Sequence, residues 1–205
     1  MQKAVATLIK GGIIAYPTDT IYGLGCDAMN MDSVKRLFKI KKRSPLDPIS
    51  ISLPQISEIS RFAHVNNKDF MNQLEKYDLL PGPVTLILKK RDHVPDILTA
   101  GKDTIGVRIP GHRVTRSLSE DLGGPITTTS ANISSEEPAS TYDDLSEEIV
   151  EKVDYVLEGN CKYKKPSTVL DLTGEEVEIL REGAEEEKIR KIISGEIEED
   201  EDEED

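Results

Sequence analysis

The residues of this chain that could do chemistry are mainly cations and hydroxyls. Three consecutive cations, residues 41–43, follow a predicted helix, and Arg108 stands inside an apolar, strand-like run. An unpaired charge there would be costly, so Arg108 must be paired or face a ligand. A run of hydroxyls ending in Ser130 and Asn132 leaves another strand. Such groups bind anions and stabilise charge that develops at phosphorus.

Each of these features also has a purely structural explanation. Cations at the end of a helix are favoured by the helix dipole. A threonine-rich strand followed by an Asx turn would leave the same pattern as a hydroxyl site. The polar loop 16–25 holds hydroxyls, a carboxylate and glycines, which either satisfy a turn or collect around a ligand at a strand end.

Several familiar catalytic patterns are missing from the sequence. There is no Walker motif, no GxSxG nucleophile elbow and no zinc-like spacing among the two cysteines and three histidines. Residues 23–28 match a GxGxxA fingerprint, but six residues separate it from the preceding strand. The tight strand–turn–helix geometry of a dinucleotide site is therefore not expected.

The elements that must position these residues form one α/β (α+β-like) domain. About seven strands alternate irregularly with about six helices, which predicts a twisted mixed sheet with flanking helices. Residues 168–172 and 177–180 are too close for a crossover helix and should form a hairpin. With 3 Phe, 6 Tyr and no Trp, the core must be largely aliphatic.

Charge is unevenly distributed along the 205 residues. The net charge is −13, but the last ten residues hold nine acids and no base. The preceding 195 residues keep all 26 bases and 30 of the 39 acids, which leaves a net charge of only −4. We expect a folded domain over residues 1–195 and a disordered acidic tail over 196–205.

The sequence also predicts a cytoplasmic protein without membrane contact. No apolar run approaches the ~20 residues that span a bilayer, and the start of the chain lacks a signal-peptide core. Cys26 and Cys161 form no CxxC pair or disulfide framework.

Seven motifs in a fixed order make a family resemblance specific. They are YPTDTIYGLGCDA, KIKKRSPLDP, LPGPVTLIL, TIGVRIPGH, TTSANISSEEPAS, PSTVLDLTG and ILREGA. Over about residues 3–183 the chain resembles the YrdC family. The resemblance implies a twisted sheet with a basic concave face. It also implies synthesis of threonylcarbamoyl-AMP and pyrophosphate from L-threonine, bicarbonate and ATP.

Partners follow from the same resemblance. Mg²⁺ is expected to arrive with ATP, and no protein-bound structural metal is expected. The product would supply a separate transferase that modifies adenosine in tRNA. The sequence does not decide whether this chain itself also binds tRNA weakly.

The resemblance also assigns roles to individual residues. Lys41 and Arg43 would be catalytic, as surface cations turned into one concavity opposite Ser130 and Asn132. The residues expected to bind threonine are Thr20, Tyr22, Arg108, Thr128 and Ser167. Those expected to bind ATP are Arg43, Thr104, Ser130, Asn132 and Arg181.

Three positions depart from the family pattern. Ser44 stands where proline is common, Ser52 where some members have histidine, and Ser135 where glycine is frequent. The alternative function is an RNA-binding module of the same fold. Against it, the body of the chain is slightly acidic and lacks interleaved aromatic residues for base stacking.

Overall fold

The structure is a computed structural model that describes residues 1–134 and 136–196. Its described part contains ten strands: β1 (Ile14–Tyr16), β2 (Gly23–Gly25), β3 (Ser50–Ser52), β4 (Ala63–His64), β5 (Val84–Lys90), β6 (Thr104–Arg108), β7 (Ile126–Ser130), β8 (Tyr155–Val156), β9 (Thr168–Asp171) and β10 (Glu178–Arg181). The helices are α1 (Gln2–Ile9), α2 (Met31–Lys41), η1 (Ile56–Glu58), α3 (Ile59–Phe62), α4 (Lys68–Lys76), α5 (Asp96–Thr99), α6 (Arg113–Leu122), α7 (Glu147–Lys152) and α8 (Glu186–Ser194).

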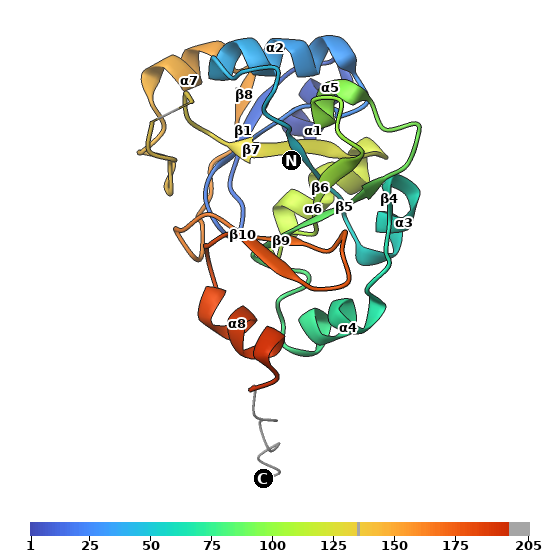
Figure 1. Cartoon of the computed structure of the whole chain (residues 1–205). Helices are drawn as coiled ribbons and strands as arrows, with labels where there is room; N and C mark the ends of the chain where they lie inside the picture. The colour runs from blue at the N-terminus through green and yellow to red at the C-terminus, as the bar shows by residue number, and fades with distance from the viewer. Residues whose placement is uncertain (135, 197–205) are drawn as a thin grey trace.

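The strands form one mixed sheet, as predicted. Their order is β10-β9-β5-β6-β3-β7-β2-β1-β8, with β4 paired to β5 off this path. Parallel pairs such as β5–β9 and β3–β6 alternate with antiparallel pairs such as β5–β6 and β3–β7. Helices α2 and α7 lie together at one end of the molecule, and α4 and α8 lie at the other (Figure 1).

The predicted hairpin near the end of the chain is confirmed. β9 and β10 pair antiparallel, with Ile179 opposite Leu170. The Asp171 side chain accepts hydrogen bonds from the Thr173 amide (2.8 Å) and hydroxyl (2.6 Å) and so stabilises the connecting turn. β10 is the strand at one edge of the sheet, and it carries Arg181 at its end.

The sheet has ten strands rather than about seven, and β2 is the most consequential addition. It lies inside the segment expected to be a polar loop, where it pairs with β1 and β7. The phenol ring of Tyr16 lies against Gly23 and Gly25. A Cβ atom on Gly25 would come within 2.7 Å of that ring and 2.8 Å of the Thr127 carbonyl oxygen. The glycines therefore allow two strands and an aromatic ring to approach closely.

Helix α2 begins and ends at clear signals. The Asn30 side chain caps it by accepting a hydrogen bond from the Ser33 amide (3.1 Å). The helix ends at Lys41 because Lys42 adopts a left-handed conformation with φ of 51°. This reversal sends Lys41 and Arg43 in different directions from the helix end.

The core is aliphatic, as predicted. One large cluster of buried side chains lies between the sheet and most of the helices. A smaller one, which includes Leu8, Tyr16, Leu118 and Ile126, joins α1 and α6 to the sheet. Among the described residues, no helix combines the length and apolar character needed to cross a bilayer.

Candidate active site

A polar cleft of about 250 Å³ lies over the middle strands of the sheet. Pockets for drug-sized ligands usually measure roughly 300–1,000 Å³, so the enclosed part suits a small molecule or one portion of a larger one. Nine of the eleven predicted site residues line it: Thr20, Tyr22, Arg43, Arg108, Thr128, Ser130, Asn132, Ser167 and Arg181. Lys41 and Thr104 are not among the lining residues.

The register of three neighbouring strands creates the cleft floor. Ser50 of β3 pairs with Thr128 of β7, and both side chains line the cleft. On the other side of Ser50 lies Gly106 of β6, where a Cβ atom would stand only 2.2 Å from the Ser50 hydroxyl. A glycine is therefore required beside Ser50, and its small size helps to keep the floor open.

Arg108 forms a buried ion pair at the inner end of the cleft. Its Nη2 atom lies 2.5 Å from Asp19 Oδ1, and both side chains are less than one-tenth exposed. The second Asp19 oxygen accepts a hydrogen bond from the Gly111 amide (3.1 Å). Arg108 Nε is buried without a partner among the described residues. The guanidinium is thus oriented on one side by Asp19 while it still faces the cleft.

Arg181 is fastened to the opposite wall by Ser167. Its Nε and Nη2 atoms donate to the Ser167 carbonyl oxygen (3.1 and 2.8 Å), and Nη2 also contacts the Ser167 hydroxyl (3.0 Å). That hydroxyl lies 2.8 Å from the hydroxyl of Thr85. Burial, followed by repulsion from Arg108, lowers the pKa of Arg181. Two guanidinium groups in one cleft form a site complementary to an anion.

Thr20 and Tyr22 lie on the segment between β1 and β2. The Thr20 hydroxyl is 3.0 Å from the hydroxyl of Thr18, which donates to the Ile21 carbonyl oxygen (2.7 Å). The Tyr22 hydroxyl donates to the Gly159 carbonyl oxygen and accepts from the Gly159 amide, both at 2.9 Å. Burial raises the pKa of Tyr22 to about 12, so it stays a neutral donor.

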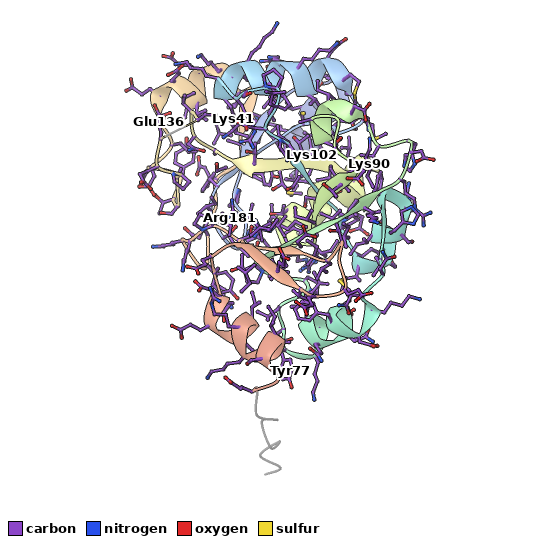
Figure 2. The ribbon with its side chains drawn as sticks, in the orientation of Figure 1. Lys41, Tyr77, Lys90, Lys102, Glu136 and Arg181 are labelled. Carbon is purple, nitrogen blue, oxygen red and sulfur yellow. The ribbon has the colours of Figure 1, made fainter. Side chains whose placement is uncertain are left out.

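Lys41 is not the surface cation that the sequence suggested. The residue is only 1% exposed, and its ammonium donates to the carbonyl oxygens of Ser130 (2.5 Å) and Asn132 (2.8 Å) and to Asn132 Oδ1 (3.1 Å). It therefore lies behind the cleft wall (Figure 2 shows it beneath α2). Burial, and then the charge of Arg43, lowers the pKa of Lys41 to about 7. The helix end carries it inward, a position that spacing alone does not reveal.

Arg43 reaches the cleft directly. Its Nε donates to the Asp47 carbonyl oxygen (3.2 Å) and its Nη2 to the Pro48 carbonyl oxygen (2.9 Å), which fixes the side chain along the loop before β3. Burial lowers the pKa of Arg43. Lys41 and Arg43 therefore have different environments although they are two residues apart.

Thr104 stands apart from the enclosed cleft. It begins β6, opposite Lys89 of β5, while Arg108 ends the same strand. Alternation along a strand puts both residues on one face of the sheet, but four residues separate them by about 13 Å. Only a ligand that extends well beyond the enclosed cleft could contact both.

The structure adds site residues that the sequence did not single out. Asp19 orients Arg108, while Thr85 and Ser50 contribute hydroxyls to the lining. The sequence offered one indication of the role of Asp19, because a carboxylate in a polar loop can pair with a buried arginine. Its partner lies 89 positions away, so sequence alone could not pair them.

The departures from the family pattern have uneven structural consequences. Ser52 pairs in register with Arg108, and its hydroxyl is buried without a hydrogen-bond partner among the described residues. The Ser44 hydroxyl accepts a hydrogen bond from the Leu46 amide (3.2 Å) in the loop that carries Arg43. Ser135 lies outside the described residues.

Comparison with protein-family models identifies the chain's relatives. Residues 6–183 match the Sua5/YciO/YrdC family model, which carries the description "Telomere recombination". This chain belongs to that family. The likeness that the motifs indicated is confirmed, and the matched residues contain every residue of the cleft.

Individual members of the Sua5/YciO/YrdC family are similar over most of the chain. A Methanocaldococcus jannaschii protein is 42% identical over 178 residues, which are 86% of this chain and 82% of the relative. The threonylcarbamoyl-AMP synthase of Hydrogenovibrio crunogenus is 37% identical over 143 residues, 69% of this chain and 77% of that enzyme.

Solved structures of family members share the fold. Pyrococcus abyssi Sua5, in a complex with L-threonine, superimposes with a TM-score of 0.86 at 32% identity and covers 96% of this chain. This chain spans only 57% of that protein. Escherichia coli YciO superimposes with a TM-score of 0.78 at 33% identity, with 89% of this chain and 88% of YciO covered. YciO is named without an activity, so family membership alone does not decide the reaction.

Proposed function

We propose that this chain is a threonylcarbamoyl-AMP synthase. The observation that carries the proposal is the cleft, which gathers Arg43, Arg108 and Arg181 around a floor of hydroxyls. Asp19 pairs with Arg108 from outside the lining, and the described lining residues themselves include no Asp or Glu. A carboxylate and a polyphosphate are the anions that such a site complements, and relatives with this fold carry the synthase name.

The two ends of the cleft suit different substrates. Arg108, with Thr20 and Thr128 nearby in the lining, would hold the carboxylate and hydroxyl of L-threonine. Arg43, Ser130, Asn132 and Arg181 would hold the phosphates of ATP. The enclosed volume fits the amino acid and the reacting groups, while the nucleoside would extend along the sheet toward Thr104.

The proposed reaction has two steps. The threonine nitrogen attacks the carbon of bicarbonate, and loss of water gives a carbamate. A carbamate oxygen then attacks the α-phosphorus of ATP in line, and the bond to the departing pyrophosphate breaks. Positioning and charge neutralisation are the main requirements of such a transfer, and a cleft with three guanidinium groups supplies both.

Mg²⁺ would enter with ATP rather than occupy a protein cage. The described residues contain no group of three or more His, Cys, Asp or Glu side chains that could hold a metal ion. When bound, Mg²⁺ would neutralise charge on the triphosphate oxygens, its usual ligands in nucleotide enzymes. A cytoplasmic location and a separate transferase that passes the product to tRNA belong to the same proposal.

Product formation tests the proposal directly. The purified protein is incubated with ATP, L-threonine and ¹³C-bicarbonate, and the products are examined by mass spectrometry. We expect threonylcarbamoyl-AMP that contains the label, together with pyrophosphate. An L-threonine-free reaction is the control, and absence of labelled product at saturating substrates would overturn the proposal. If tRNA binds in a salt-dependent way while no adenylate forms, the RNA-binding alternative is the better account.

A further inference from the structure

Lys41 carries a buried positive charge, and none of the acidic side chains that the structure describes pairs with it. No Asp or Glu oxygen within the described ranges, 1–134 and 136–196, forms an ion pair with its ammonium, although the residue is only 1% exposed. Removing a charge from water without a counterion is expensive unless every donor is used. Figure 2 labels Lys41 beneath α2, on the opposite side of β7 from Arg181.

All three donors of the ammonium are used on one short segment of chain. They bond the Ser130 carbonyl oxygen (2.5 Å), the Asn132 carbonyl oxygen (2.8 Å) and Asn132 Oδ1 (3.1 Å). The main chain of Lys41 adds a fourth link, because its carbonyl oxygen accepts from the Ser134 amide (2.9 Å). The last residue of α2 thus holds the chain after β7 through both its side chain and its backbone.

The same segment provides two side chains to the cleft wall. The Ser130 hydroxyl donates to Asn132 Oδ1 (2.5 Å), and Asn132 Nδ2 donates to the Glu136 carbonyl oxygen (2.5 Å). Asn132 Oδ1 therefore accepts from both Ser130 and Lys41. The orientation of this amide, and of the hydroxyl bonded to it, depends on the ammonium behind the wall.

We propose that Lys41 is a positioning residue, which sets the places of Ser130 and Asn132 in the nucleotide-binding wall and does not itself contact the nucleotide. This inference rests on the proposed function, which assigns that wall to the phosphates of a nucleoside triphosphate. Without the ammonium, three oxygen atoms with like partial charges would face one another across a buried gap. The segment would shift to reach water, and the Ser130 and Asn132 side chains would leave the places from which they would contact the phosphates.

The adjacent lysine provides a matched control. Lys42 is exposed, and its ammonium pairs with Glu148 (2.8 Å) on α7. Lys41→Met keeps the length and apolar stem of the side chain but removes its charge and donors, and Lys42→Met makes the same chemical change outside the wall.

Calorimetry with α,β-methylene-ATP measures the affinity of the wall without turnover. We expect at least a tenfold loss for Lys41→Met, no more than a twofold change for Lys42→Met, and L-threonine affinity within twofold of wild type in both. In steady state, KM for ATP should rise by the same factor, while kcat at saturating ATP falls less. Unchanged analogue affinity, or a large loss of kcat with affinity intact, would overturn the inference.

A double-mutant cycle separates positioning from direct contact. If Lys41 acts through Asn132, the Lys41→Met/Asn132→Ala protein should bind the analogue within twofold of Asn132→Ala alone. Fully additive losses would show an independent contact and overturn the inference. If Lys41→Met does not fold, Lys41→Gln, which keeps one amide donor group, takes its place in both measurements. If the wild-type protein binds the analogue but forms no product, the proposed reaction is wrong, and the inference about Lys41 is unaffected.

Discussion

Arg108 and Asp19 form a buried pair in which Asp19 has a structural role and Arg108 has a binding role. Asp19 has partners for both oxygens, whereas Arg108 faces the cleft and its Nε has no partner within the described part of the chain. The asymmetry implies that Asp19 serves to orient Arg108, and that Arg108 has donor capacity left for a substrate.

Replacement of Arg108 should therefore affect L-threonine binding first. We expect Arg108→Ala to weaken L-threonine affinity by roughly 2–4 kcal/mol, as when one partner of a buried, hydrogen-bonded charge pair is removed. Calorimetric titration of L-threonine into the folded variant measures this change, and ATP-analogue affinity serves as the internal control.

The same variant leaves Asp19 buried without its cation, so stability must be measured alongside. Breaking a buried pair costs about 3–5 kcal/mol of unfolding free energy. If that loss appears in urea denaturation while L-threonine affinity is unchanged, Arg108 is only the structural partner of Asp19.

The lowered pKa of Lys41 has a consequence for stability at different pH values. Its pKa is about 7 in the folded protein, against an ordinary value of 10.5, because burial and Arg43 disfavour the charged form. Above pH 7 the unfolded chain binds more protons at this site than the folded one. Unfolding free energy should then rise with pH, by up to about 1.4 kcal/mol per unit.

Urea denaturation between pH 7.5 and 8.5 measures that slope, above the range in which His112, whose pKa burial lowers from 6.5, adds a rise of its own. This pH range ends below the ordinary pKa values of thiols and phenols. Burial raises the pKa of Tyr16 and Cys26, so at higher pH these groups would make the unfolding free energy fall as pH rises. Lys41→Met should lose the rise and Lys42→Met should keep it. Equal slopes in all three proteins would show that Lys41 is fully charged across this range.

The sequence indicates which residue types form the site better than it indicates the environment of each residue. It anticipated that Arg108 needs a partner or a ligand, because charge within an apolar strand requires one. It placed Lys41 on the surface, which is wrong. The direction of a side chain at the end of this helix depends on the left-handed conformation of Lys42. Residue spacing does not predict that conformation.

Among the elements, β2 shows how a strand can depend on residues that have no strand preference. Gly23 and Gly25 flank Leu24, and their pairing with β1 and β7 brings the Tyr16 ring against bare backbone. The longer helices and strands were predictable because apolar periodicity marks them, but the described residues hold eight α-helices rather than about six, and the four-residue α5 was not predicted. β2 was not, since its pairing is set by distant strands rather than by its own side chains.

A methyl group at Gly25 should test this packing. It would stand 2.7 Å from the Tyr16 ring and 2.8 Å from the Thr127 carbonyl oxygen, and the backbone atom cannot move aside cheaply. We expect Gly25→Ala to lower unfolding free energy by about 1–3 kcal/mol, the usual cost of overpacking. Thermal and urea unfolding provide the measurement.

Gly124 offers a control for the intrinsic effect of replacing glycine. Nothing lies within 4 Å of a Cβ atom built there, and its backbone is not left-handed. Gly124→Ala should stay within about 0.5 kcal/mol of wild type. A similar loss in both variants would mean that crowding at Gly25 is not the cause.

On the scale of the whole molecule, the acidic end of the chain holds nine of its 39 acids. Residues 197–205 lie outside the described residues, so the tail and the 1–195 domain boundary stay predictions. A chain truncated after Gly195 should form threonylcarbamoyl-AMP at a rate within twofold of the full chain, because a dense block of like charge adds nothing to the cleft. Loss of most activity in a truncated protein that is still folded would show that the acidic residues take part.

The order of the strands determines at which stage of folding the cleft forms. Its lining residues come from positions as far apart as Thr20 and Arg181, and the sheet that carries them pairs β5 with β9 across the span from Val84 to Thr168. Such pairing between distant parts of the chain makes closure of the sheet a slow step in folding. A bound substrate then stabilises the whole fold, by about 2.7 kcal/mol at a concentration 100 times its dissociation constant. Amide hydrogens remote from the ligand, including those of β1 and β9, should exchange more slowly when the cleft is filled.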